Sequence, residues 1–336
     1  MSAIAFLSTK SLYLIDMSIS TDKPILRSPF PWFGGKSRAA PLIWSRLGNP
    51  INFVEPFAGS LATLLLRQDY DPLLHTETVN DLDCYVANFW RALSFDPEAV
   101  AHWADAPVNE ADLSARHLWL VNQSEFQERM KTDPDYFDVK IAGWWVWGIC
   151  SWIGSGWCAT INNGRVNRKL PHLGDNGQGV HRQRPHLSDN GQGDSSHSSE
   201  LLKYFDALAY RLRRVRVCCG DWQRVMGASP TDRLGVTGIL LDPPYDQTKR
   251  RSNLYAVETQ VSSQVREWAI ANGHNPLLRI ALCGLVDEHE MLDSWECCEW
   301  KAVSGYGGDN GNPKKERIWF SPHCLKPSDR IQFSLF

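Results

Sequence analysis

Residues 52–67 read NFVEPFAGSLATLLLR: a short apolar run, a glycine-containing turn and a second apolar run. The first run has the length of a buried strand, and the leucines after the turn are typical of a helix. In doubly wound folds, the first strand–turn–helix unit lets the backbone approach a nucleotide-like ligand at the carboxyl end of the strand. The segment therefore predicts a doubly wound α/β domain with a ligand site at this turn.

Short β-like runs recur along the chain. They lie at 51–54, 73–80, 213–219, 236–241, 278–283, 296–303 and 315–321. Most are separated by helical patterns at 38–47, 60–68, 84–94 and 201–214. The last pattern has an apolar stripe of Leu201, Phe205, Leu208 and Leu212. Strands alternating with helices predict a seven-stranded, mainly parallel sheet covered on both faces, and the final two runs, linked by GYGGDNGNP, predict a hairpin at its edge.

The region between the second and third β-like runs breaks this alternation. We assign residues 96–199 to an inserted recognition region, and residues 27–95 with 200–336 to a catalytic domain. Residues 1–26 form an N-terminal extension that we expect to be dispensable, with Met17 as a candidate start. Charged residues interrupt the apolar residues of this extension, which argues against a signal peptide.

Two segments of the inserted region have an unusual composition. PHLGDNGQG at 171–179 recurs as PHLSDNGQG at 185–193, and its Gly, Asn and Asp residues favour a mobile surface loop over a dedicated recognition element. Residues 141–164 carry no charge, but glycines, asparagines and tryptophans throughout argue against a membrane span. They predict a buried helix running into a glycine-rich loop, with the tryptophans of 144–157 in the core.

The cysteines give no sign of a disulfide framework or a metal site. A chain of 336 residues can bury an ample core without disulfide bonds. Its nine cysteines have neither CxxC spacing nor a nearby Cys/His ligand pattern. We therefore expect reduced thiols, a cytoplasmic protein and no bound metal.

The formal charge of −3 argues against a uniformly basic nucleic-acid binder, but the basic residues are clustered. The clusters are Arg165, Arg168, Lys169, Arg182 and Arg184; Arg211, Arg213, Arg214 and Arg216; and Lys249, Arg250 and Arg251. Each cluster taken singly is typical of a solvated face. Three clusters beside candidate functional segments together indicate a polyanionic partner.

Residues 238–251 read GILLDPPYDQTKRR. The apolar residues predict a strand that delivers Asp242 to its carboxyl end, because a residue before proline is held extended. Pro243 and Pro244 fix φ and lack N–H groups, so the carbonyls there are rigid hydrogen-bond acceptors. Tyr245 adds an aromatic face suited to stacking on a planar ring. A strand ending in a simple proline turn is the alternative interpretation.

Three further motifs offer ligand-binding groups. PWFGGKSR at 31–38 supplies glycines, a lysine and aromatic residues, although an ordinary turn before a helix has the same pattern. Asp81 ends the second β-like run, where a carboxylate can accept hydrogen bonds from ribose hydroxyls. In CCGDW, Asp221 can accept a hydrogen bond from an exocyclic amine and Trp222 can pack on a purine; a helix N-cap at Asp221 is the alternative.

The order of these motifs is FGGK, EPFAGS, ND, a long insertion, GDW and DPPY. It resembles the Dam-type, alpha-class family of S-adenosylmethionine-dependent DNA N6-adenine methyltransferases, in which the cofactor motifs precede the catalytic one. The resemblance covers residues 29–68, 77–95 and 215–247, and the C-terminal strands more loosely. Leu61 stands where the family often has another glycine, and the insertion matches only through fragments such as GRVNRKLP (164–171).

The resemblance implies a Rossmann-like class I methyltransferase that binds S-adenosylmethionine and flips the target adenine out of double-stranded DNA. It implies cofactor-binding roles for Trp32, Lys36, Glu55, Pro56, Phe57 and Gly59 on the methionine side, Asp81 at the ribose, and Asp221 with Trp222 at the adenine. The implied catalytic positions are Asp242, Pro243, Pro244 and Tyr245. We expect phosphate contacts from Lys249, Arg250 and Arg251, and next from Arg165, Arg168 and Lys169.

Other functions compete with this expectation. Motif order and the acid that begins DPPY favour adenine over cytosine N4 in DNA, RNA adenine or a protein amide nitrogen. A non-catalytic DNA-binding protein with the same fold is disfavoured by the joint retention of all five motifs. An oxidoreductase that uses a dinucleotide is least favoured, because GxGxxG is missing after the first β-like run. We expect a monomer or weak dimer that does not bind membranes.

Overall fold

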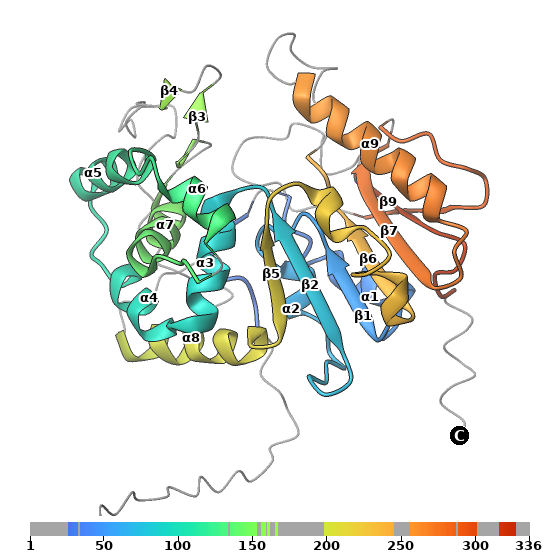
Figure 1. Ribbon diagram of the computed structural model, residues 1–336, viewed down its shortest axis with the longest axis horizontal. Helices are drawn as coiled ribbons and strands as arrows, with labels where there is room; N and C mark the ends of the chain where they lie inside the picture. Colours follow the sequence, from blue (N-terminus) through green and yellow to red (C-terminus); the bar gives the residue numbers. More distant parts are fainter. Residues whose placement is uncertain are drawn as a thin grey trace, which may run out of the picture.

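The computed structural model describes residues 26–32, 34–133, 135–152, 156–158, 160–161, 165–166, 198–244, 256–286, 288–300 and 316–326. These residues form a sheet flanked by helices, with a further group of helices beside one edge of the sheet (Figure 1). The predicted extension up to residue 25, the PHLxDNGQG repeat and the GYGGDNGNP linker lie outside the described residues.

The sheet has seven strands. They are β1 (Asn52–Glu55), β2 (Thr76–Asp81), β5 (Val215–Cys219), β6 (Thr237–Leu241), β7 (Leu278–Leu285), β8 (Glu296–Glu299) and β9 (Glu316–Phe320). Their order is β5-β2-β1-β6-β7-β9-β8, and the first five run parallel. β9 is antiparallel to both β7 and β8. This arrangement confirms the predicted mainly parallel sheet with an antiparallel pair at its edge.

The strand order reverses beside β1. The chain adds β2 and β5 on one side of β1, and then β6 and β7 on the other. Asn52 is in register with Thr76 on one neighbour and with Thr237 on the other. In open α/β sheets, ligands bind beyond the carboxyl ends of the strands at such a switch point. Glu55, which ends β1, and Asp242, which follows β6, lie there.

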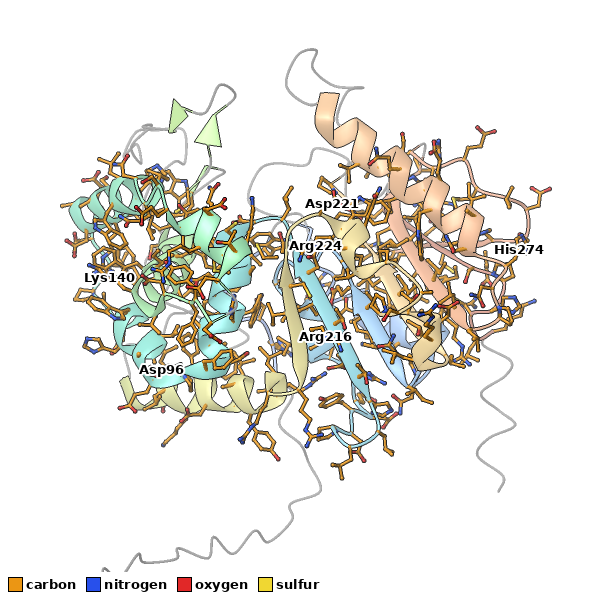
Figure 2. All side chains as sticks on the ribbon, in the orientation of Figure 1. Asp96, Lys140, Arg216, Asp221, Arg224 and His274 are labelled. Atoms are coloured by element: carbon orange, nitrogen blue, oxygen red, sulfur yellow. The ribbon has the colours of Figure 1, made fainter. Side chains whose placement is uncertain are left out.

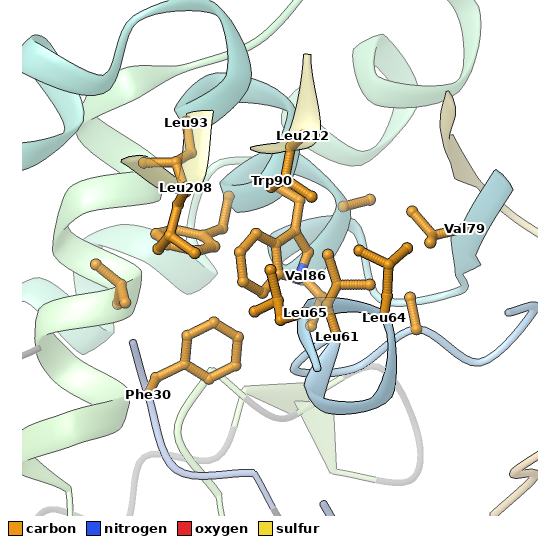
Figure 3. Close-up of a cluster of buried hydrophobic side chains, with 14 of the residues drawn as sticks. Phe30, Leu61, Leu64, Leu65, Val79, Val86, Trp90, Leu93, Leu208 and Leu212 are labelled. Atoms are coloured by element: carbon orange, nitrogen blue, oxygen red, sulfur yellow. The ribbon is translucent and has the colours of Figure 1, made fainter. Parts of the chain in front are cut away.

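Helices of the first half of the chain and one later helix cover one face of the sheet. They are α1 (Ala40–Leu47), α2 (Ala62–Leu65), α3 (Cys84–Phe95) and α8 (Ser198–Leu212). Trp90 of α3 is buried in a cluster with Leu64 and Phe30 (Figure 3). The predicted stripe of α8, formed by Leu201, Phe205, Leu208 and Leu212, is buried in the same cluster, which confirms the helical periodicity.

The opposite face of the sheet is covered by α9 (Ala256–Asn272) and by the short helix η1 (Trp222–Val225). Val54 of β1 belongs to this second buried cluster, whereas its neighbour Phe53 belongs to the first. Successive strand residues point to opposite faces, so a strand covered on both faces buries every position. This requirement accounts for the apolar runs of β6 and β7, whereas β2 buries Glu77 and Asn80 with polar partners.

Three elements are shorter than predicted. The strand predicted at 296–303 ends at Glu299, and Trp300 lies outside it. The helix predicted at 60–68 spans only α2, since the N–H groups of Leu66 and Arg67 donate to carbonyls three residues back instead of four. The strand predicted from residue 73 begins at Thr76. There, Asp71 accepts a hydrogen bond from the N–H of Leu73 at 2.8 Å and holds a turn.

Four helices beside β5 form a unit that we call the helical lobe: α4 (Pro97–Ala104), α5 (Glu110–Val121), α6 (Phe126–Thr132) and α7 (Val139–Ser151). Figure 2 shows Lys140 on its outer side. Trp145 and Trp147 of α7 are buried, which confirms the predicted buried helix. Gly148 permits this packing, because a Cβ there would lie 1.8 Å from Trp157. No helix within the described residues is long and apolar enough to cross a membrane.

Candidate active site at the carboxyl edge of the sheet

Four neighbouring strands end at, or just before, an acidic residue. Glu55 ends β1, Asp81 ends β2, Asp242 follows β6, and Asp221 comes two residues after β5. Because these strands are parallel, their carboxyl ends share one edge of the sheet. Figure 2 shows Asp221 at this edge. The fold thus brings candidate residues from four separate motifs to one edge.

Lys36 and Asp242 join the motifs PWFGGKSR and DPPY. Lys36 Nζ lies 2.8 Å from Asp242 Oδ1, and it also donates to the carbonyl of Gly34 at 2.8 Å. The Lys36 side chain is 3% exposed, whereas that of Asp242 is 21% exposed. Burial lowers the pKa of Lys36, but nearby negative charges, above all Asp242, outweigh burial and the net shift is upward. Lys36 and Asp242 therefore form an ion pair whose lysine is buried and whose acid is partly open to solvent.

The backbone around Asp242 follows from the two prolines. All five residues of β6 are buried, and the strand stops before Asp242 because Pro243 and Pro244 cannot donate hydrogen bonds to a neighbouring strand. Pro243 is buried and Pro244 is exposed. Tyr245 lies outside the described residues, so its stacking role stays a prediction.

Glu55 is a buried acid with an unpaired oxygen. Its side chain is 4% exposed, and Oε2 has no hydrogen-bond partner among the described residues. Burial raises its pKa well above the usual value, and the negative charges around it, of which Asp242 is the largest, add to the shift. A buried polar atom without a partner costs about 1–3 kcal/mol. A polar or cationic group of a ligand would therefore be stabilised at this position.

Asp81 holds the turn that follows β1. Its Oδ2 accepts a hydrogen bond from the N–H of Gly59 at 2.9 Å, and its Oδ1 accepts one from the N–H of Asp83 at 2.9 Å. Burial, followed by the charge of Asp83, raises the pKa of Asp81 to about 7. Asp81 thus links the EPFAGS and ND motifs, and its carboxylate titrates near neutral pH.

Asn80 connects the same loops, although the sequence motifs did not single it out as a site residue. Its Nδ2 donates to the carbonyl of Pro56 at 3.1 Å and to the carbonyl of Gly220 at 2.9 Å. From β2 it therefore ties together the loops that follow β1 and β5. The only sequence signal was a polar residue within a strand that is otherwise expected to be buried.

The turn at Gly59 packs against Trp32. Gly59 has a φ of +45°, and a Cβ there would lie 2.3 Å from Trp32 Nε1. The carbonyl of Gly59 also accepts a hydrogen bond from Trp90 Nε1 at 2.9 Å. Only glycine allows this close approach, which places Trp32 of PWFGGKSR directly on the EPFAGS turn.

Leu61, the departure from the resembled family, adopts a backbone conformation that favours glycine. Its φ is +54°, in the left-handed region. This conformation costs a residue other than glycine about 1–2 kcal/mol. The Leu61 side chain is fully buried, which contributes about 1.5–3 kcal/mol. Burial thus offsets the strain and makes leucine compatible with the turn.

Asp221 and Trp222 occupy different environments. Asp221 is exposed, and its Oδ1 accepts the N–H of Gln223 at 2.9 Å, so it caps η1 as the alternative interpretation predicted. Trp222 is only 4% exposed, and its ring stacks on Phe57 with 6.1 Å between centroids. The ring expected to pack on a purine therefore lies mostly within the second buried cluster. Its Nε1 has no partner within the described part of the chain.

Most of the residues expected to contact phosphate fall outside the described residues. These are Lys249, Arg250, Arg251, Arg168 and Lys169. Only the backbone of Arg165 is described, in β4 (Arg165–Val166), which pairs with β3 (Thr160–Ile161). Their DNA contacts stay predictions.

One member of the basic cluster at 211–216 is paired inside the protein. Arg211 Nη1 lies 2.7 Å from Oε2 of the buried Glu77. Arg214 donates to the carbonyl of Pro72 at 3.2 Å, and Arg216 to Thr78 Oγ1 at 3.4 Å. The Arg211 charge is therefore compensated inside the protein.

The described part of the inserted region is acidic. Residues 96–138, which include α4, α5 and α6, contain ten acidic and three basic residues. Such a surface repels phosphate, so we do not expect DNA contacts from these helices. The predicted DNA contacts of the inserted region thus belong to its later, basic part at 165–184.

Metal binding and relationships to known proteins give no further assignment. Across the described ranges, no group of three or more His, Cys, Asp or Glu side chains is placed to hold a metal ion. Comparison with protein-family models and with curated proteins finds no match to the chain. The assignment of function therefore depends on the geometry of the carboxyl edge.

Proposed function

We propose that this chain transfers a methyl group from S-adenosylmethionine to the N6 amine of adenine in DNA. The observation that carries the proposal is the 2.8 Å contact between Lys36 and Asp242 at the switch point of the sheet. The contact joins the FGGK and DPPY motifs, which the resembled Dam-type family uses for the cofactor and for the target amine. A Rossmann-like sheet with this strand order is compatible with a class I methyltransferase.

The acidic edge suits the charge of this cofactor. S-adenosylmethionine carries a positive sulfonium and, at neutral pH, a positive ammonium group. Glu55 offers an unpaired buried oxygen, and Asp242 offers an acid that is partly open to solvent. Asp81, at the end of β2, is assigned to the ribose, and Asp221, two residues after β5, is assigned to the adenine. Where these acids are ionised they would repel the pyrophosphate of a dinucleotide, which favours the cationic cofactor over a nicotinamide one.

Asp242 and the backbone carbonyl that follows it hold the target amine of adenine in position. The bound cofactor supplies a methyl group on sulfur, which is already an excellent leaving group, so the task left to the protein is mainly positioning. The amine of adenine is a poor nucleophile because its lone pair is delocalised into the ring. The Asp242 carboxylate and the Pro243 carbonyl accept its two N–H groups and direct the lone pair out of the ring plane. Acceptors fixed in advance need little reorganisation in the transition state.

Lys36 keeps this acceptor in place. Its ammonium group lies 2.8 Å from Asp242 Oδ1 and fixes the side chain at the end of β6. Asp242 therefore orients the amine, and the proton leaves to water after methyl transfer.

The amine cannot reach this edge from inside a duplex, so we expect the base to be flipped out. Tyr245 would stack on the flipped base. Lys249, Arg250 and Arg251, and next Arg165, Arg168 and Lys169, would hold the phosphates, which makes binding dependent on salt.

The test is nucleoside analysis. Protein, labelled cofactor and unmethylated DNA are incubated, and the DNA is digested. We expect label in N6-methyladenine and a loss of rate of about 100-fold or more in Asp242→Ala. Asp206→Ala, at an exposed position on α8, is the matched control and should keep the wild-type rate. Label only in N4-methylcytosine, no label in the DNA, or an unchanged rate in Asp242→Ala would contradict the proposal.

A further inference from the structure

Two cysteine thiols lie in contact next to the carboxyl edge of the sheet. Cys84 is the first residue of α3, and Cys219 is the last residue of β5. Their sulfur atoms are 3.6 Å apart, and Cys219 Sγ donates a hydrogen bond to Cys84 Sγ. Cys84 is buried, whereas Cys219 is half-buried. The two thiols are 135 positions apart in the sequence, so only the fold brings them together.

The pair lies against the acids assigned to ribose and adenine. Cys219 is directly opposite Asp81 in the β2–β5 register, and the next residue, Gly220, donates its N–H to the Asp81 carbonyl at 2.9 Å. Cys84 follows Asp81 by three positions, and Asp221 follows Cys219 by two. A change in the distance between the two sulfur atoms would therefore move the backbone that carries both acids.

Cys84 is the more acidic of the two thiols. The hydrogen bond donated by Cys219 lowers the pKa of Cys84 and raises the pKa of Cys219. The N-terminus of α3 adds a positive electrostatic potential at Cys84, which favours the thiolate. Each of the other seven cysteines has a raised pKa, chiefly because of burial: Cys150, Cys158, Cys218, Cys283, Cys297, Cys298 and Cys324. The cysteine whose pKa is lowered, Cys84, is therefore the one that already has a partner thiol in contact.

We propose that Cys84 and Cys219 form an oxidant-sensitive dithiol site that closes to a disulfide bond with hydrogen peroxide. The Cys84 thiolate attacks the peroxide, breaks its O–O bond and becomes a sulfenic acid, with release of hydroxide. The Cys219 sulfur then attacks the sulfenic sulfur, the S–S bond forms, and water leaves. Two thiols together lose two electrons, which reduce one peroxide to two waters. A thiol reductant reduces the disulfide bond back to two thiols and is itself oxidised to a disulfide.

Closure of the disulfide would disturb the adenosine side of the pocket. A disulfide bond holds its sulfur atoms about 2 Å apart, so the thiols must approach each other from their 3.6 Å contact. The end of β5 and the start of α3 move with them, and the hydrogen bond between Gly220 and Asp81 is strained. This consequence rests on the proposed function: oxidation should weaken S-adenosylmethionine binding by about tenfold, as expected for a typical coupling between two sites.

The chemical test uses a variant that retains the pair but lacks the more exposed thiols: Cys218→Ser, Cys297→Ser and Cys298→Ser in one full-length chain. After peroxide treatment, non-reducing peptide mapping should show a Cys84–Cys219 linkage and a loss of two titratable thiols, both reversed by dithiothreitol. Cys84→Ser and Cys219→Ser in this background should each abolish the linkage. If one of them fails to fold by circular dichroism, the other serves as the control. Two intact thiols after treatment, or a linkage elsewhere, would overturn the proposal.

The functional test is calorimetric titration of S-adenosylmethionine into the reduced and the oxidised protein. We expect affinity to fall about tenfold on oxidation, to recover with dithiothreitol and to be insensitive to peroxide in Cys219→Ser. A disulfide that forms with unchanged affinity would refute the coupling. A reduced protein that does not bind the cofactor would refute the proposed function and leave the dithiol result intact, so the two failures are distinguishable.

Discussion

Glu55 and Glu77 are buried glutamates on neighbouring strands of the same sheet, but only Glu77 has its charge compensated by arginine side chains. Glu77 is 0% exposed and lies near the amino end of β2, where Arg67 Nη1 is 3.0 Å from Oε1 and Arg211 Nη1 is 2.7 Å from Oε2. Glu55 is also buried, 4% exposed, at the carboxyl end of β1, yet its Oε2 has no partner among the described residues. Between these two glutamates, burial therefore does not separate the structural acid from the candidate ligand-binding acid, whereas compensation of the charge does.

The strongest test of this comparison is Glu77→Gln. The change leaves two buried guanidinium groups without their carboxylate, and breaking a buried ion pair in this way costs about 3–5 kcal/mol. Urea denaturation should show that loss in the free energy of unfolding.

Glu299→Gln is the matched control. Glu299 forms an ion pair with Arg317 at 2.6 Å, but its side chain is 78% exposed. Exposed pairs contribute about 0–1 kcal/mol, so this variant should unfold almost as the wild type does. Equal losses in the two variants would show that the Glu77 cluster is not the structural element that we describe.

A smaller effect is expected at the turn beside Glu55. Gly59→Ala places a Cβ 2.3 Å from Trp32 Nε1 in a left-handed backbone conformation, and strain of this kind costs about 1–3 kcal/mol. Thermal unfolding should record the loss, and cofactor binding should weaken because Trp32 and the Gly59 N–H are displaced together. Gly227→Ala is the control, since a Cβ there meets no atom within 4 Å. Matching behaviour of the two variants would contradict the proposed packing.

A further test is a dependence on pH that has opposite signs for stability and for binding. The pKa of Asp81 is raised to about 7 and that of Glu55 is also raised, both chiefly by burial. A carboxyl group with a raised pKa in the folded state stabilises the protein at low pH, and this contribution is lost as pH rises through the folded pKa. The free energy of unfolding of the ligand-free protein should therefore fall between pH 5 and pH 8.

Binding should respond in the opposite direction, because the ionised acids attract a cationic cofactor. Affinity for S-adenosylmethionine should rise over the same pH range, and Glu55→Gln should flatten both profiles. Calorimetry and thermal unfolding at matched pH values would check this prediction. An affinity that falls as pH rises would count against a cationic ligand at this edge.

Local sequence patterns were sufficient to predict the sheet and the helices α1, α3 and α8, but not α9, which covers the opposite face of the sheet. The predicted helices have an apolar stripe such as Leu201 to Leu212, which leaves a signal in their own residues. Residues at strand ends, such as Asp81 and Asp242, could be predicted for the same reason. The rule that parallel strands share a carboxyl edge then brings these acids together.

Contacts between residues that are far apart in the sequence could not be predicted in this way. Arg211 gave the pattern of an exposed basic cluster, but its partner Glu77 is 134 positions away. Asn80 joins loops that follow two other strands, and Trp222 stacks on Phe57 from a different strand end. In each case the decisive contact is a property of the assembled fold, and no local periodicity encodes it.

The most direct test of the central claim is calorimetric titration of S-adenosylmethionine into the reduced wild-type protein and into Glu55→Gln. The uncompensated acid predicts one bound cofactor per chain in the wild type. It predicts an affinity about tenfold lower in the variant. The melting temperature of the variant should be no lower than that of the wild type, because the change removes only an unpaired buried acid. A wild-type protein that takes up no cofactor, or equal affinity in the two proteins, would contradict the assignment of this edge as the cofactor site.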